Sequence, residues 1–179
     1  MSAPLRILII GRNGQVSRAL QSRLSDMGEL LVRGSDQLDL AQPDSLRAPI
    51  EALRPGLIIN AAAHTAVDQA ESEPERAFAV NATAPGILAQ AAVELGIPLI
   101  HYSTDYVFDG LKPAPYTEDD TPNPLSVYGR SKLAGENAIR QAGDQHLILR
   151  TSWVYSTEGR NFLLTMPVSY THLTLPTKA

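Results

Sequence analysis

The chain of 179 residues contains no cysteine, and this absence removes several kinds of chemistry at once. Disulfide bonds, thiol nucleophiles and thiolate metal ligands are all excluded. A chain without cysteine is compatible with a reducing compartment, and we expect a cytoplasmic protein. Aromatic residues are also scarce, at 6% of the chain, and Trp153 is the single tryptophan.

Basic patches and long apolar runs are missing as well. The formal net charge is −4, and the 15 lysines and arginines are scattered along the chain, so we predict no nucleic-acid partner. The apolar run at 5–10 contains Arg6 and ends at a glycine, which makes it too short for a signal peptide or a membrane span. We therefore predict no membrane association. Hydrophobic residues still make up 44% of the chain, enough to bury a full core.

What the chain does have is an alternation of short apolar runs and amphipathic segments. Runs typical of strands buried on both faces lie at 5–10, 29–32, 57–60, 97–103 and 146–150. Apolar residues at helical spacing fill 16–27, 46–53, 76–95 and 127–141. This pattern predicts an α/β fold, a Rossmann-like doubly wound parallel sheet with helices on both faces. Ligands of such folds bind beyond the carboxyl ends of the strands.

The end of the chain departs from this alternation. Residues 161–166 begin like another helix, but Pro167 follows, and the remaining residues show no period. We therefore assign 1–166 to an NAD(P)-binding Rossmann-like domain. Residues 167–179 are predicted to be a non-native or disordered tail.

A glycine loop follows the first predicted strand directly. Gly11, Gly14 and Ser17 form a Gly-x-x-Gly-x-x-Ser variant of the dinucleotide-binding fingerprint, at the point where a helix begins. Glycines there permit close approach of the backbone, and the free N–H groups of the helix N-terminus attract a pyrophosphate. A bare glycine pattern would more often be an ordinary turn, so the position between strand and helix carries the prediction.

The residues after the second strand bear on the choice of cofactor. Arg33 and Ser35 suit a 2′-phosphate better than the carboxylate that selects NAD, which favours NADPH, with NADH as the alternative. Asp36 lies close enough to weaken this preference, and Arg33 could equally be a solvent-exposed side chain.

A hydroxyl, a phenol and an amine occur where catalytic groups are expected. Tyr128 and Lys132 are four residues apart and share a helix face, so the ammonium is expected to lower the tyrosine pKa from about 10 toward neutrality. Ser103 and Thr104 end the fourth strand, where a hydroxyl can bind the same substrate oxygen. Together these groups indicate a general acid for a carbonyl that receives a hydride. A solvated surface pair is the simpler interpretation of the Tyr–Lys spacing alone.

Four longer motifs add a family resemblance. The sequences NAAAHTAVDQAE at 60–71, STDYVFDG at 103–110, PYTE at 115–118 and YGRSKLAGE at 128–136 resemble those of the dTDP-4-dehydrorhamnose reductases, extended short-chain dehydrogenase/reductases. The resemblance covers 5–166. It implies NAD(P)H-dependent reduction of the 4-keto group of dTDP-4-dehydro-L-rhamnose to dTDP-L-rhamnose, a step in nucleotide-sugar and cell-surface polysaccharide (lipopolysaccharide, O-antigen) synthesis. It further implies a dTDP-sugar substrate, a homodimer in the full-length form, and a C-terminal substrate domain that is largely missing here.

The resemblance also implies roles for individual residues. Tyr128 is the expected proton donor, Lys132 binds the cofactor ribose and tunes Tyr128, and Thr104 assists at the substrate carbonyl. Thr104, Asp105 and Trp153 are the expected substrate contacts. The expected cofactor contacts, besides Tyr128 and Lys132, are Gly11, Gly14, Gln15, Val16, Asp39, Leu40, Ala63, His64 and Thr65. No metal site is expected.

Several alternatives stay open at this point. His64 could be an ordinary loop histidine, Trp153 could pack in the core, and His101, inside a strand, is expected to be structural. A dehydratase is disfavoured because Tyr106 follows Asp105, where the resembled dehydratases need a second carboxyl group. Another sugar-nucleotide epimerase or reductase, or a non-catalytic subunit resembling the regulatory subunit of methionine adenosyltransferase, remains in competition.

Overall fold

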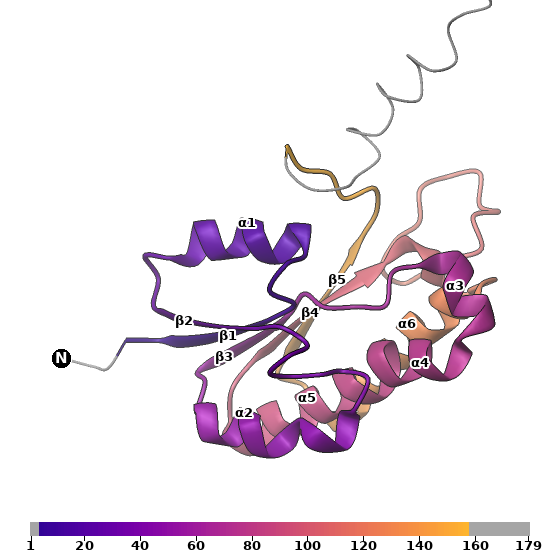
Figure 1. The fold of residues 1–179 in the computed structure, drawn as a ribbon. Helices are drawn as coiled ribbons and strands as arrows, with labels where there is room; N and C mark the ends of the chain where they lie inside the picture. Colours follow the sequence, from indigo (N-terminus) through magenta and orange to yellow (C-terminus); the bar gives the residue numbers. More distant parts are fainter. Residues whose placement is uncertain (1–3, 158–179) are drawn as a thin grey trace, which may run out of the picture.

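The computed structural model describes residues 4–157, and these form one parallel sheet with helices on both faces (Figure 1). Five strands stand in the order β2-β1-β3-β4-β5. Their bounds are β1 Arg6–Ile10, β2 Glu29–Arg33, β3 Leu57–Asn60, β4 Leu99–Thr104 and β5 His146–Thr151. The chain leaves β1 for one edge and returns to its other side for β3, which is a topological switch point. The prediction of a Rossmann-like doubly wound sheet is confirmed.

The core has two layers because successive side chains of β1 point to opposite faces of the sheet. Ile7 and Ile9 pack with residues of α1 (Gln15–Leu24), whereas Leu8 and Ile10 pack with residues of α2 (Arg47–Leu53) and α5 (Ala84–Leu95). In Figure 1, α1 lies above the sheet and α2 and α5 below it. Burial on both faces explains why the apolar runs do not alternate with polar residues.

Helix α6 (Val127–Ala142) lies beside α5 (Figure 1), and Nζ of its Lys132 donates to the carbonyl of Tyr102 near the carboxyl end of β4. Parallel pairing sets Asn60 of β3 opposite His101 of β4, and Thr104 of β4 opposite Thr151 of β5. The strand ends and the loops that follow them therefore meet at one edge of the sheet.

The helix predicted over 76–95 is continuous in the structure, but it is not α-helical throughout. The structure has α4 at Pro74–Phe78, a π-helical segment, η2, at Ala79–Thr83, and then α5. Because Pro85 has no N–H group, it cannot donate to the carbonyl four residues earlier, that of Asn81. That carbonyl lies so close to Gly135 of α6 that a Cβ there would stand 2.0 Å from its oxygen. A separate short helix, α3 (Val67–Ser72), precedes α4.

Some expectations fall outside this region. The helix expected at 161–166 and the tail expected at 167–179 lie outside the described residues. Within 4–157, no helix combines the length and apolar character needed to cross a membrane.

Candidate active site

Two cavities adjoin the glycine loop at the carboxyl edge of the sheet. The larger, of about 1100 Å³, extends toward β4, β5 and α6, and the smaller, of about 430 Å³, extends toward the loop after β2. Every residue predicted for cofactor or substrate lines at least one of them. The larger is lined by Gln15, Val16, Thr104, Asp105, Tyr128, Lys132 and Trp153, the smaller by Gly11, Asp39, Leu40 and His64, and both by Gly14, Ala63 and Thr65. The arrangement suits a dinucleotide laid across the loop, with one half in each cavity.

The two glycines of the loop meet different demands. Gly11 has a φ of 105°, and a Cβ there would lie 3.0 Å from the backbone nitrogen of Ala62, so both its backbone and its packing require glycine. Gly14 has an ordinary φ of −69° at the N-cap of α1, and a Cβ there would meet nothing closer than 3.7 Å. Since packing does not require glycine at 14, the open surface beside the helix N-terminus is a cradle that fits a pyrophosphate.

Replacing Gly14 by alanine is expected to separate binding from folding. The change should cost about 1 kcal/mol of stability, because alanine is a poorer N-cap than glycine while the added Cβ meets nothing closer than 3.7 Å. It should weaken NADPH binding at least ~10-fold by filling the cradle, since tenfold corresponds to about 1.4 kcal/mol. Cofactor fluorescence titration and thermal unfolding measure the two effects. Gly11→Ala is the contrasting variant and should lose both NADPH binding and stability. An unchanged Kd for Gly14→Ala would contradict the placement of the pyrophosphate.

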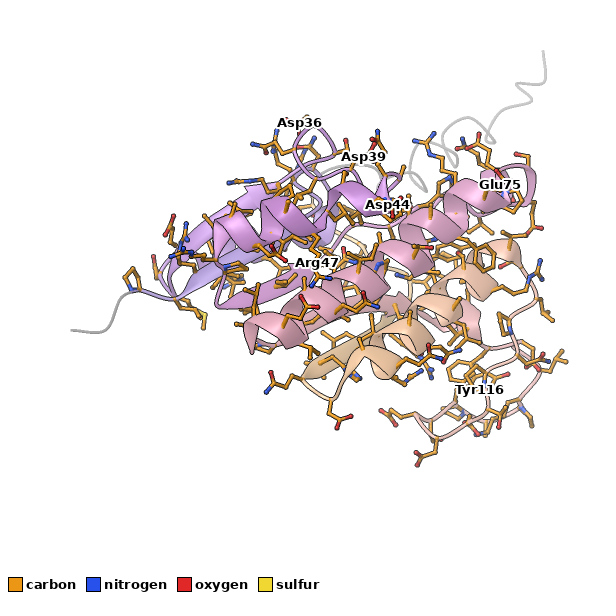
Figure 2. All side chains as sticks on the ribbon, turned by 90° about the horizontal axis from the view of Figure 1, so that it is seen from below. Asp36, Asp39, Asp44, Arg47, Glu75 and Tyr116 are labelled. Atoms are coloured by element: carbon orange, nitrogen blue, oxygen red, sulfur yellow. The ribbon has the colours of Figure 1, made fainter. Side chains whose placement is uncertain are left out.

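The sequence interpretation named Arg33 as the cation for a 2′-phosphate, and the structure differs at this point. Arg33 does not line the smaller cavity, and its guanidinium donates to the carbonyl of Val32 at 3.0 Å. Arg12 does line it, and forms an ion pair with Asp36 at 3.1 Å. Figure 2 shows Asp36 and Asp39 on this loop, away from Tyr116. The arginines that line the smaller cavity, and are available to a 2′-phosphate, are therefore Arg12 of the glycine loop and Arg76, which sequence reasoning missed.

Tyr128 and Lys132 are both held inside the first two turns of α6. The Oγ of Ser126 caps the helix by accepting from the backbone N–H of Gly129 at 3.0 Å. Tyr128 is 9% exposed and Lys132 is 1% exposed, so the solvated surface pair is excluded. Burial lowers the pKa of Lys132 to about 8.

The expected lowering of the tyrosine pKa is wrong for this structure. Burial raises the pKa of Tyr128, and only the hydrogen bond with Thr104 opposes that rise. The Nζ of Lys132 lies instead 2.7 Å from the carbonyl oxygen of Tyr102 and 3.2 Å from Nε2 of His101. The phenol of Tyr128 is therefore protonated throughout the neutral range.

The two hydroxyls that end β4 have different surroundings. Ser103 donates to the carboxylate of Glu136 at 2.6 Å, whereas Thr104 lies next to Tyr128 and bonds to Asp105 and to the backbone N–H of Tyr106, each at 3.2 Å. Thr104, rather than Ser103, is thus placed to share an oxygen with Tyr128.

Trp153 and His64 lie in different surroundings. Trp153 is 72% exposed and lines the larger cavity, so the core-packing alternative is wrong. His64 lies in a loop whose backbone is held at both its N–H and its carbonyl by the side-chain amide of Asn81, at 2.8 and 3.0 Å. Its Nδ1 is buried and has no hydrogen bond to the described part of the chain.

Asn81 itself was not foreseen. Its amide also donates to Ser131 of α6 at 3.0 Å, so it ties the loop at 61–65 to the helix that carries the Tyr–Lys pair. A buried asparagine on an otherwise apolar helix was the available signal, because a buried polar group needs partners.

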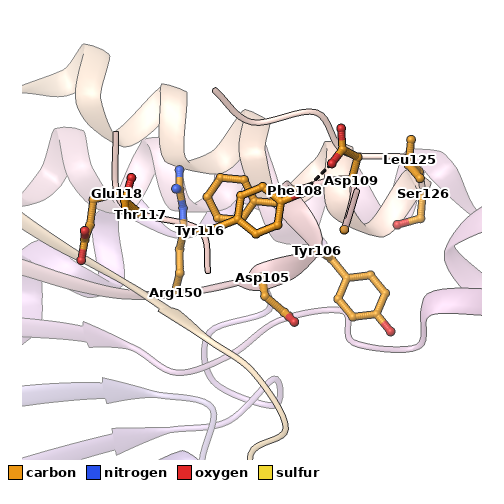
Figure 3. A pocket seen from close by; sticks show the side chains of 11 residues that line it. Asp105, Tyr106, Phe108, Asp109, Tyr116, Thr117, Glu118, Leu125, Ser126 and Arg150 are labelled. Atoms are coloured by element: carbon orange, nitrogen blue, oxygen red, sulfur yellow. Dashed lines mark hydrogen bonds between the residues drawn. The ribbon is translucent and has the colours of Figure 1, made fainter. Parts of the chain in front are cut away.

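A third hollow, of about 590 Å³ and drawn in Figure 3, shares Asp105 and Tyr106 of its lining with the larger cavity. Phe108 stacks on Tyr116 with ring centroids 4.2 Å apart, and the Arg150 guanidinium lies 5.0 Å from the Phe108 ring. The Tyr116 hydroxyl donates to Asp109 at 2.6 Å, and this bond, with those from Asn123 and the backbone, lowers the pKa of Asp109 to about 2. These contacts order the loop between β4 and α6. In the described ranges, no group of three or more acidic or histidine residues could hold a metal ion.

Comparison with known proteins agrees with this geometry. The family model of the RmlD substrate binding domain matches residues 5–172. Curated relatives called dTDP-4-dehydrorhamnose reductase include one from Sinorhizobium fredii, 51% identical over 162 residues, and one from Escherichia coli K12, 48% identical over 166 residues. The alignments cover 90% of this chain but 55% and 56% of those proteins, so the chain spans about half the length of the curated relatives it matches.

Solved structures give the same result. The dTDP-4-dehydrorhamnose reductase from Clostridium acetobutylicum is 38% identical with a TM-score of 0.90, and covers 94% of this chain and 60% of its own. That from Bacillus anthracis, in complex with NADP, is 36% identical with a TM-score of 0.88 and the same coverage. The resemblance stated from the sequence motifs is confirmed, and the chain belongs to the RmlD substrate binding domain family.

Proposed function

We propose that this chain is the cofactor-binding and proton-donating part of an NADPH-dependent reductase that converts the 4-keto group of dTDP-4-dehydro-L-rhamnose to the alcohol of dTDP-L-rhamnose. The observation that carries the proposal is the larger cavity, in which Tyr128 and Thr104 face the same space as Gly14 and the N-terminus of α1. The two curated relatives named dTDP-4-dehydrorhamnose reductase are 51% and 48% identical to this chain over the matched region.

The residues divide the work by position. The N–H groups that begin α1 would hold the pyrophosphate, and Lys132 would reach the nicotinamide ribose from beneath. NADPH supplies the hydride when bound. Tyr128 keeps its proton at neutral pH because burial raises its pKa, and would donate that proton to the carbonyl oxygen as the hydride arrives. Thr104 would hold the same oxygen with its hydroxyl.

The substrate side is formed by Asp105 and Trp153. Ser152 donates to Asp105 at 2.6 Å, which fixes a carboxylate that can accept from sugar hydroxyls. The exposed indole of Trp153 offers an apolar face to a sugar ring. Arg12 and Arg76 line the smaller cavity and favour NADPH, while Asp36, paired with Arg12, leaves NADH as an alternative. A homodimer of the full-length form and a cytoplasmic location stay predictions.

Two measurements test the proposal. Fluorescence titration of the chain with NADPH is expected to show binding, and NADPH absorbance is expected to fall when dTDP-4-dehydro-L-rhamnose is added to the protein completed by the rest of its gene. Binding without oxidation would favour the non-catalytic regulatory role. Oxidation with a different nucleotide sugar, but not with this one, would point to another reductase of the same scaffold.

A further inference from the structure

A buried chain of hydrogen bonds runs beneath Lys132. The backbone N–H of Ala62 donates to Oδ1 of Asn60 at 3.2 Å, Nδ2 of Asn60 lies 3.1 Å from Nδ1 of His101, and Nε2 of His101 lies 3.2 Å from Nζ of Lys132. Asn60 and His101 are fully buried, and Lys132 is 1% exposed. This series of hydrogen bonds links β3, β4 and α6 at the level where β3 and β4 pair.

The hydrogen bond from Ala62 to Asn60 determines which atom donates and which accepts in each of the others. A backbone N–H can only donate, so the atom of Asn60 that faces Ala62 must be the oxygen, and the atom that faces His101 must be the amide nitrogen. An amide nitrogen also only donates, so Nδ1 of His101 accepts and carries no proton. Burial and the neighbouring Lys132 lower the pKa of His101, which keeps the ring neutral. A neutral ring with a bare Nδ1 has its proton on Nε2, and this N–H faces the lysine.

This direction bears on the charge of Lys132. A neutral amine has a lone pair that accepts from Nε2–H, whereas an ammonium has only donors and opposes it. The carbonyl of Tyr102 accepts from Nζ in either state. Among charged neighbours, Glu136, one turn along α6, favours the ammonium, and its own charge is shared with Arg150 of β5. The phenol of Tyr128 lies one turn earlier on the same helix.

We propose that Asn60 and His101 are positioning residues which set the proton occupancy of Lys132: Asn60 fixes the histidine tautomer, and the tautomer presents a donor to the lysine. The tautomer is a property of the folded chain alone. Its consequence for proton donation by Tyr128 rests on the proposed reductase function.

Asn60→Asp tests the direction of the hydrogen bonds. The carboxylate has nearly the shape of the amide and keeps an oxygen for Ala62, but it places an acceptor where the amide donated. We expect Nδ1 of His101 to gain a proton and Nε2 to become an acceptor for the lysine. Nitrogen NMR of the histidine-labelled chain distinguishes protonated from bare ring nitrogens, and the His101 signals are those absent in His101→Gln. Asn137→Asp is the matched control on the exposed side of α6, and should leave these signals unchanged.

The spectrum of the unchanged chain already decides the first part. A proton on Nδ1 of His101 in that spectrum would overturn the proposal, whether or not Asn60→Asp folds. An unchanged tautomer in a folded Asn60→Asp would overturn it as well.

The pH profile of kcat/KM tests the second part. Because the variant gives the ammonium an acceptor at Nε2, we expect its alkaline limb to move up by about one pH unit, a tenfold change in proton affinity. If Asn60→Asp reverses the tautomer of His101 but leaves the alkaline limb of kcat/KM at the same pH, the proposed role of the lysine proton in turnover is overturned. Absence of turnover in the unchanged protein would instead refute the reductase function, and the NMR result would stand.

Discussion

Replacing Tyr128 by phenylalanine is expected to slow the proposed carbonyl reduction by ~10²–10⁴-fold, the range that a positioned general acid contributes. The substitution removes one hydroxyl and keeps the ring. That ring packs edge-on against Tyr106 at a centroid distance of 5.5 Å and belongs to a cluster with Ala70, Ala77 and Val127, contacts that phenylalanine preserves. The loss should therefore appear in kcat, with the free energy of unfolding and the NADPH affinity little changed.

The matched control is Tyr116→Phe. It removes the same atom from a tyrosine that lines the third hollow and neither cavity beside the glycine loop. Loss of its bond to Asp109 should cost about 1 kcal/mol of stability and leave turnover within a few fold. Stopped-flow measurement of NADPH oxidation compares the two. A Tyr128→Phe enzyme that kept more than a tenth of the original rate would show that the proton comes from elsewhere.

The strands could be predicted from the sequence because their signal is local. Burial on both faces produces continuous apolar runs, and the run at 29–32 became β2 at Glu29–Arg33, an extension by one residue. The π segment within the helix over 76–95 was not predicted, because the spacing of apolar residues shows neither that Pro85 cannot donate to the carbonyl of Asn81 nor that this carbonyl lies close to Gly135 of α6. Helical spacing does not reveal what a neighbouring helix requires.

The same distinction applies to the site. The glycine loop and the Tyr–Lys spacing are contained in a few consecutive residues, so the sequence was enough to propose them. Asn60 and His101 are 41 residues apart, and only the parallel register of β3 and β4 brings them together. The pKa of Tyr128 was predicted in the wrong direction because spacing shows neither where Nζ of Lys132 lies nor how much water is excluded from the phenol.

Glu136→Ala is expected to destabilise the fold by about 3–5 kcal/mol, the usual cost of removing one partner of a buried ion pair. The carboxylate is fully buried and binds Ser103 at 2.6 Å, Arg150 at 2.9 and 2.7 Å and Arg140 at 2.9 Å, so it joins α6 to β4 and β5. Without it, the guanidinium of Arg150, whose side chain is 18% exposed, loses its counter-ion. Urea unfolding measures the change. Glu51→Ala, in an i,i+4 pair with half-exposed side chains, is the control and should cost at most ~1 kcal/mol.

The pH dependence of the free energy of unfolding tests whether the charge of the Glu136 carboxylate is what stabilises the fold. Burial alone would raise the pKa of Glu136, but the hydrogen bonds from Arg150 and Ser103 and the charge of Arg150 outweigh it, so the pKa lies below its usual value. A carboxyl whose pKa is lowered by folding contributes stability that is complete above its unfolded pKa and lost as the pH falls through its folded one. Glu136→Gln keeps the shape but cannot ionise, so the stability gap between it and the unchanged protein should be widest at neutral pH and narrow in acid. Asp109 and Asp120 also have lowered pKa values, but both proteins share them and they cancel in the gap. A gap that stayed constant down to acid unfolding would mean that shape, not charge, is what position 136 contributes.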